Sequence, residues 1–287
     1  MLILQAIVLG IVQGLTEFIP ISSSAHLIVV PWLFGWTAPA LTSLPFDVAL
    51  HLGTLIAVLW FFAEDWVRLV RAGFASIVER RIGGDLDRRL AWLLVVGCIP
   101  GGVVGVLAES KIEKLFHEPN TPIKASAMIV MGILIAVLGV ALFAAERIAR
   151  HERGASAVSF KDAVVVGIAQ ALAIFPGVSR SGSTITAGLW LGLERETAAR
   201  FSFLLSAPII AGAGLKSLLE VYAGYASGAI APGDLLLFPI GLVVAALSGY
   251  LCIKFLLRFL QKNSTDLFVY YRWALAALVI VVAFVRG

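Results

Sequence analysis

The sequence has few charged residues and few cysteines. Asp, Glu, Lys and Arg make up 14% of its 287 residues, whereas an average soluble domain has about 25%. Hydrophobic residues make up 60%, and the mean hydropathy is +0.97. These values exclude a soluble globular domain. The two cysteines, Cys98 and Cys252, lie far apart within apolar segments, so neither a disulfide framework nor a cysteine metal cluster is expected.

Two other features are missing. The first residues, Met1 to Gln5, lack the basic start of a signal peptide, and no small-residue cleavage pattern follows, so we expect no cleaved leader. The net charge of +4 would suit a nucleic-acid partner, but Lys and Arg occupy short loops between apolar runs. Membrane topology explains that distribution more simply. We expect membrane lipids, and no nucleic acid, as partners.

Long apolar runs are plentiful. Six segments are long enough to cross a bilayer, which needs about 20 helical residues; they are 46–63, 90–108, 125–146, 201–220, 235–257 and 270–286. Two more apolar regions, 1–36 and 162–193, are interrupted by Pro, Gly and a serine cluster, so their arms are too short to span. We interpret each as a re-entrant helix hairpin, because irregular backbone is tolerated at membrane depth where protein buries it.

The two hairpin regions contain related sequences. Residues 10–24 align without gaps on residues 167–181, and seven of the fifteen positions are identical. Because three spans follow each hairpin, the second copy must be inverted in the membrane relative to the first. We therefore predict an all-α integral membrane protein with one membrane domain over residues 1–287. It consists of two inverted-topology repeats, about 1–146 and about 160–287, and each repeat is a re-entrant helix hairpin plus three transmembrane helices.

The distribution of Lys and Arg predicts the orientation. The predicted loops 64–89, 147–161, 194–200 and 254–272 fall on one face and contain sixteen of these residues. The opposite face has four: Lys111, Lys114, Lys124 and Arg286. The positive-inside rule places the first face in the cytoplasm. Both termini and the mouth of the first hairpin are then expected outside.

The hairpin tips carry the chemistry. Ser22, Ser23 and Ser24 precede one half-helix, and Ser179, Arg180 and Ser181 precede the other. Two helix N-termini that point into one cavity form an anion site, and phosphate is the usual anion. Arg180 adds a fork of donors that matches phosphate oxygens. The serines have a simpler role available, since serine caps helices routinely.

The first tip also carries an acid and a base. Ser23 and His26 are three residues apart and share a helix face, so they are expected to approach hydrogen-bond range as an activated nucleophile. Gln13 and Glu17 share a face of the preceding arm. Glu17 is suited to orient His26, to act as general base or to hold a divalent metal with phosphate oxygens. An acid, a His and an Arg at membrane depth indicate function.

Other polar residues leave alternatives open. Asp47 and His51, four apart, are either support for the site or a helix-terminal pair. Arg200 is expected to anchor at the interface, and Lys216 to extend its amine to the membrane surface. His117 and His151 lie in loops without a partner pattern.

The chain resembles the undecaprenyl-diphosphate phosphatase family, the bacitracin-resistance integral membrane enzymes. The resemblance rests on residues 13–26, 46–55, 175–184 and 201–205, which keep the family's order over nearly the whole chain. The family's first motif is an acid or Gln, then three residues, then Glu, and here it is Gln13 and Glu17. The Gln form leaves one carboxylate, which weakens the case for a two-carboxylate metal site.

The resemblance implies hydrolysis of undecaprenyl diphosphate to undecaprenyl phosphate and orthophosphate, which recycles the carrier lipid for cell-wall synthesis and confers bacitracin resistance. It implies a multi-pass protein of the bacterial cytoplasmic membrane, with an active site open to the periplasm and a need for a divalent cation, Mg²⁺ or Ca²⁺. The sequence leaves the oligomeric state open, a homodimer included.

Roles for individual residues follow from the resemblance and the tips together. Ser23 is expected to be the nucleophile, His26 the acid/base, Arg180 the diphosphate clamp and Glu17 an orienting base or metal ligand. The supporting substrate-binding residues are Gln13, Ser22, Ser179 and Ser181. Whether Ser23, His26 or water attacks phosphorus stays open. The alternative function is a secondary transporter or lipid flippase that uses the same midplane anion site.

Overall fold

The computed structural model describes residues 1–113, 124–226 and 234–286. Among these residues the regular elements are all helical, apart from one isolated bridge between Arg153 and Leu193. The helices are α1 (Leu2–Thr16), α2 (Ser23–Phe34), α3 (Leu44–Phe61), α4 (Ala63–Val78), α5 (Leu86–Glu113), α6 (Ala125–Ile148), η1 (Ala155–Ala157), α7 (Phe160–Ala171), η2 (Leu172–Ile174), α8 (Arg180–Trp190), α9 (Arg195–Ala226), α10 (Leu237–Leu260) and α11 (Asp266–Arg286).

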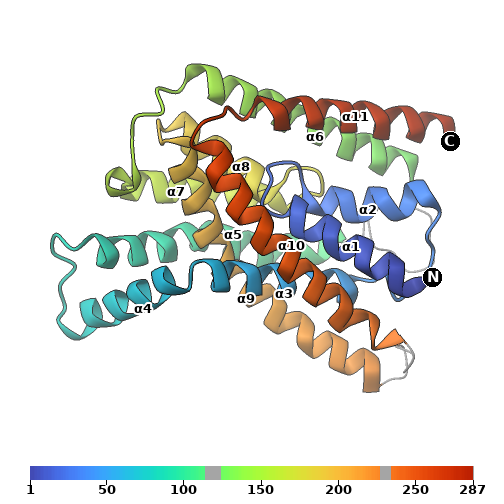
Figure 1. Cartoon of the computed structure of the whole chain (residues 1–287), viewed down its shortest axis with the longest axis horizontal. Helices are drawn as coiled ribbons and strands as arrows, with labels where there is room; N and C mark the ends of the chain where they lie inside the picture. Colours follow the sequence, from blue (N-terminus) through green and yellow to red (C-terminus); the bar gives the residue numbers. More distant parts are fainter. Residues whose placement is uncertain (114–123, 227–233, 287) are drawn as a thin grey trace.

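The six predicted spans are confirmed as long apolar helices. In the described part of the chain, six helices are long and apolar enough to cross a membrane: α3, α5, α6, α9, α10 and α11. The two regions predicted as hairpins form the shorter pairs α1–α2 and α7–α8. The protein is therefore a multi-pass membrane protein, and both chain ends lie at the same end of the molecule (Figure 1).

Helix α4 was not expected from the sequence, which we interpreted as a loop over 64–89. Its charged residues lower the average hydropathy and hide a strongly amphipathic helix. Helix α4 packs on α5, and the indole of Trp92 donates a 2.8 Å hydrogen bond to the Ser76 hydroxyl. In Figure 1 the α4–α5 turn lies at the end of the molecule opposite the two termini.

The first helix of each short pair packs against a long helix of the other half of the chain. Helix α1 lies on α10, and α7 lies on α5. Glycines permit this approach at equivalent positions. A Cβ atom at Gly10 would lie 2.9 Å from the carbonyl oxygen of Gly241, and one at Gly167 would lie 2.5 Å from that of Gly97. Small residues let membrane helices approach closely in this way.

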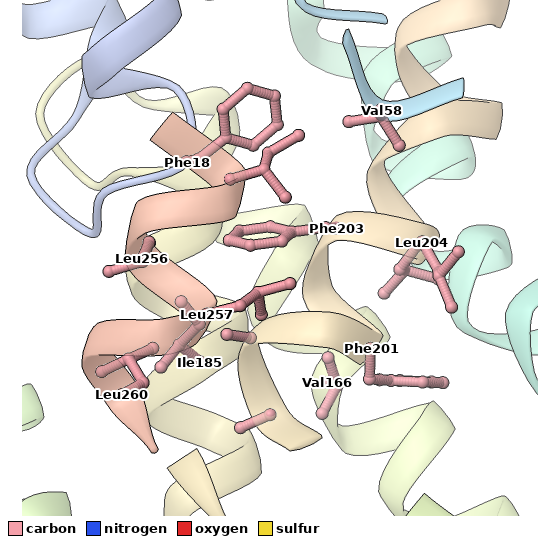
Figure 2. Close-up of a cluster of buried hydrophobic side chains, with 14 of the residues drawn as sticks. Phe18, Val58, Val166, Ile185, Phe201, Phe203, Leu204, Leu256, Leu257 and Leu260 are labelled. Atoms are coloured by element: carbon pink, nitrogen blue, oxygen red, sulfur yellow. The ribbon is translucent and has the colours of Figure 1, made fainter. Parts of the chain in front are cut away.

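A buried apolar cluster holds the first tip against the second half. The Phe18 ring meets the Phe203 ring of α9 edge to face, with 5.3 Å between centroids. Figure 2 shows these two rings beside Leu256 and Leu257 of α10. All four side chains are buried. The segment between α1 and α2, where Glu17 and Ser22 lie, is therefore fixed by packing on both sides.

Candidate functional site

The two tips have the same local conformation at equivalent positions. Ser22 caps α2 with φ 78°, and Ser179 caps α8 with φ 70°. Each hydroxyl accepts a hydrogen bond from the amide three residues on, at Ala25 (3.4 Å) and Gly182 (3.1 Å). A non-glycine residue with such a φ costs about 1–3 kcal/mol and commonly marks a functional site. The capping role predicted for Ser22 is confirmed, and Ser179, expected only to support substrate binding, caps α8 in the same way.

Glu17 is the centre of the site, and side chains from both halves converge on it. One carboxylate oxygen accepts from the Ser23 hydroxyl at 2.5 Å and from the Gln13 amide at 3.0 Å. The other accepts from the Arg180 guanidinium at 2.6 Å. Glu17 is only 6% exposed, so the cation is needed to balance its buried charge. Arg180 also donates to the carbonyl of Ser202 at 3.3 Å.

His26 is not paired with Ser23, contrary to the sequence expectation. Its Nδ1 donates to the Ser22 carbonyl at 2.6 Å, and its Nε2 accepts from the Tyr271 hydroxyl at 2.7 Å. The two rings also stack, 5.7 Å apart. A neutral imidazole has one donor and one acceptor nitrogen, and both are used. Ser23 instead bonds to Glu17, the residue at which α1 ends.

A cavity of about 340 Å³ opens beside Glu17 and Arg180. His51, Asp47 and Ser24 contribute its other polar side chains. Most of the remaining wall is apolar, from residues including Leu27, Ile28, Val48, Ile174, Ile209 and Ile210. A charged end with an apolar wall suits an amphiphile that carries an anionic head.

His51 lies at the site, and Asp47 fits both alternatives, because it lies in the first turn of α3 and also lines the cavity. His51 Nε2 lies 3.7 Å from Glu17, while Nδ1 donates to the Asp47 carbonyl at 2.7 Å. The sequence signal was their four-residue spacing on α3, but nothing in that spacing shows that α3 faces the first tip. Ser181 has a different task from capping: its hydroxyl donates to the Ile19 carbonyl of the first tip at 3.2 Å.

Arg272 was placed wrongly by the charge count, which assigned it to a loop over 254–272. It lies within α11 and is fully buried. Its guanidinium donates to the carbonyls of Ile135, Pro20 and Gly177. Without Arg272 the face assigned to the cytoplasm still has fifteen Lys and Arg against four. Its contacts involve backbone atoms from three distant segments, so no sequence pattern reveals them.

The residues around Glu17 fit a divalent cation only in part. Among the described residues, no group of three or more His, Cys, Asp and Glu side chains is placed to hold a metal. Gln13 Oε1 is buried and has no hydrogen-bond partner, and it belongs to the side chain that donates to Glu17. Amide and carboxylate oxygens suit Mg²⁺ and Ca²⁺, and Mg²⁺ sites are commonly completed by substrate phosphates. These two side chains fit such a shared site.

The other expectations have mixed outcomes. Arg200 pairs with Asp65 and lies over the Phe62 ring. His151 bonds to the Glu146 carbonyl at 3.1 Å. Cys98 and Cys252 are free thiols. The side chains of Lys216 and His117 lie outside the described residues.

The chain matches a known protein family over nearly its whole length. The family model described as "Bacitracin resistance protein BacA" matches residues 6–278. A protein of Thermomicrobium roseum is 48% identical over 98% of this chain and 99% of its own length. One of Moorella thermoacetica is 48% identical over 100% of both, and one of Methanobrevibacter smithii is 44% identical over 96% of both. All three carry the name undecaprenyl-diphosphatase. By its full-length match and the identity of these relatives, the chain belongs to the bacitracin resistance protein BacA family.

Proposed function

We propose that this protein is an undecaprenyl-diphosphatase that hydrolyses undecaprenyl diphosphate to undecaprenyl phosphate and orthophosphate. The observation that carries the proposal is the convergence of Ser23 and Arg180 on the buried carboxylate of Glu17. In this proposal the three side chains supply a hydroxyl, a base and a phosphate-binding cation beside a cavity with an apolar wall. The product is the carrier lipid for cell-wall synthesis, and its recycling explains the family's bacitracin resistance.

The two halves form inverted-topology repeats, and the pairs α1–α2 and α7–α8 are re-entrant hairpins that meet near the membrane midplane. Three facts support this arrangement: the matching caps at Ser22 and Ser179, the exchanged packing of α1 on α10 and α7 on α5, and the common end of both termini. The excess of Lys and Arg on the opposite face orients the molecule with both termini in the periplasm. The mouth of the first hairpin then opens to the periplasm, where the diphosphate headgroup of the lipid is reached.

Arg180 and the two helix N-termini bind the diphosphate. The free N–H groups of α2 and α8 and their dipoles attract the anion. Arg180 uses one nitrogen for Glu17 and another for the Ser202 carbonyl, which fixes the plane of its guanidinium. A fixed guanidinium offers its remaining donors to phosphate oxygens in a defined direction.

Ser23 is the nucleophile and Glu17 is its base. The Ser23 proton passes to Glu17 while Oγ bonds to the terminal phosphorus and the bridging P–O bond breaks, which releases undecaprenyl phosphate. Water then adds to phosphorus, the P–Oγ bond breaks and Glu17 returns the proton to Oγ. One proton of the water stays on orthophosphate and the other leaves to solvent. The 2.5 Å contact between Ser23 and Glu17 supports this transfer.

A divalent cation, Mg²⁺ or Ca²⁺, would be held by Glu17 and Gln13 together with oxygens of the diphosphate. It would supply positive charge to the oxygens of the transferred phosphoryl group. His26 is a positioning residue in this scheme, because both of its ring nitrogens are already engaged. It fixes the Ser22 carbonyl at the start of α2, and Ser23 follows directly.

The test is phosphate release from undecaprenyl diphosphate by the purified protein in detergent, with and without a chelator. We expect hydrolysis by the wild type and a loss of at least about a hundredfold in Ser23→Ala and Glu17→Gln. Ser206→Ala is the matched control, since this buried hydroxyl donates to the Phe203 carbonyl of its own helix. A wild type that moves the lipid across vesicles without releasing phosphate would support the transporter alternative instead. If Ser23→Ala hydrolysed the substrate at the wild-type rate, water rather than Ser23 would be the group that attacks phosphorus.

A further inference from the structure

Arg272 is a fully buried arginine within α11. It is 0% exposed, although arginine is among the residues least often buried. Among the side chains that the structure describes, those of residues 1–107, 124–214 and 234–286, no carboxylate forms an ion pair with its guanidinium. An unpaired cation in a membrane helix is costly and marks a functional position. The free-energy cost of burying this charge has to be offset by the hydrogen bonds that the guanidinium donates.

The guanidinium holds both tips at once. Nη1 donates to the carbonyl of Pro20 at 3.1 Å, and Nη2 donates to that of Gly177 at 3.0 Å. In the ungapped alignment of the two repeats, Pro20 and Gly177 are the same position. Nε completes the fork with the Ile135 carbonyl of α6 at 3.0 Å. One planar group therefore fixes the distance and orientation between two equivalent backbone sites.

The two carbonyls belong to residues close in sequence to Ser23 and Arg180, the two side chains that bind Glu17. Pro20 is three residues before Ser23, and Gly177 is three residues before Arg180. Ser23 and Arg180 are themselves equivalent positions, and both bind Glu17. A shift of either tip would separate the hydroxyl from its base or the cation from its carboxylate.

We propose that Arg272 is a positioning residue for phosphate transfer, which aligns the two tips by binding their equivalent carbonyls. It is 0% exposed and its guanidinium donates to three backbone carbonyls, so it acts through the tips rather than on the substrate. A second contact has the same purpose: the Ser181 hydroxyl of the second tip donates to the Ile19 carbonyl of the first. This inference rests on the proposed phosphatase activity.

The test measures kcat, KM and thermal stability in one detergent for Arg272→Gln, Arg272→Lys and the wild type. We expect Arg272→Gln to lower kcat by about a hundredfold, the effect of a misplacement of about 1 Å, and to change KM by less than about threefold. Arg286→Gln is the matched control, because this exposed arginine of α11 also donates to backbone carbonyls, those of Trp32 and Leu33. It should keep kcat within about twofold.

Arg272→Lys keeps the charge but lacks the planar fork. We expect it to stay folded and still to lose at least about tenfold in kcat. If Arg272→Gln does not fold, Arg272→Lys alone decides, and a normal kcat for it would overturn the proposal.

A double-mutant cycle separates positioning from general destabilisation. Ser181→Ala should lower kcat several-fold in the wild type but hardly at all in Arg272→Gln, because the tips are already released there. Ser206→Ala, combined with Arg272→Gln, should be additive. Additive effects of Ser181→Ala and Arg272→Gln would overturn the proposal, as would a near-normal kcat for Arg272→Gln. If the wild type itself released no phosphate, the proposed function would fail and this inference with it; an active wild type with equally active Arg272 variants would overturn this inference alone.

Discussion

Removal of Arg180 should destabilise the protein as well as inactivate it, because it leaves the carboxylate of Glu17 buried without a cation. Breaking a buried pair costs about 3–5 kcal/mol. We expect about 3 kcal/mol for Arg180→Ala, the lower end, since the side chain of Arg180 is 14% exposed at the cavity. In the double variant Arg180→Ala/Glu17→Gln the glutamine is neutral, so the loss should fall to about 1–2 kcal/mol, the cost of the remaining unmade hydrogen bonds.

Thermal unfolding in detergent measures these differences. At about 2 °C per kcal/mol, Arg180→Ala should lower the Tm by about 6 °C, and the double variant by about 2–4 °C. Arg200→Ala is the control, because Arg200 pairs with Asp65 but is 39% exposed, and an exposed pair contributes less than about 1 kcal/mol. The stability losses of Arg180→Ala and Glu17→Gln should not sum to the loss of the double variant. If they did so to within about 0.5 kcal/mol, Glu17 and Arg180 would not be a buried, mutually dependent pair.

Measurement of kcat tests the pair of Glu17 and Arg180 independently of stability. Arg180→Lys should recover little of the kcat, since an ammonium cannot contact Glu17, the Ser202 carbonyl and a phosphate in one plane. Phosphate release at saturating substrate measures this, and near-normal turnover by Arg180→Lys would show that a point charge is enough.

Three further predictions concern the parts around the site. His26→Ala and Tyr271→Phe should have strongly non-additive effects on kcat because the two side chains bond at 2.7 Å; additive effects would separate them. A cysteine that replaces exposed Thr37 should react with an impermeant thiol reagent outside intact cells, and one that replaces exposed Ala155 should not; the reverse pattern would invert the topology. Burial raises the pKa of Asp162, but hydrogen bonds from Arg153 and Ser159 outweigh it and hold that pKa below its usual range. The stabilisation by the Asp162 carboxylate is thus present at neutral pH and lost as pH falls through the lowered pKa. Asp162→Asn should therefore lower the Tm equally from about pH 8 to about pH 5 and have no effect below about pH 4. A loss of its effect already at about pH 6 would contradict this.

The sequence by itself determined the membrane class, the six apolar spans and the two regions that form short helix pairs, because hydropathy and chain breakers act locally along the chain. It also located Glu17, Ser23 and Arg180, since the internal alignment shows where the two copies differ in chemistry. It missed α4 because the charges of an amphipathic helix cancel its apolar residues in an average over a window. Such averages detect spans and are insensitive to helices at an interface.

The tertiary structure decided which of these residues touch. The spacing of Ser23 and His26 allowed a contact, but the turn of the tip directs Ser23 to Glu17, and α11 supplies Tyr271 to occupy His26. The contacts of Arg272 were also decided by the tertiary structure. Its three partners are backbone carbonyls, which every residue has, so the sequence does not indicate which ones it binds. A sequence records side-chain chemistry and local periodicity, whereas the approach of two tips and one arginine from distant segments depends on how the helices pack.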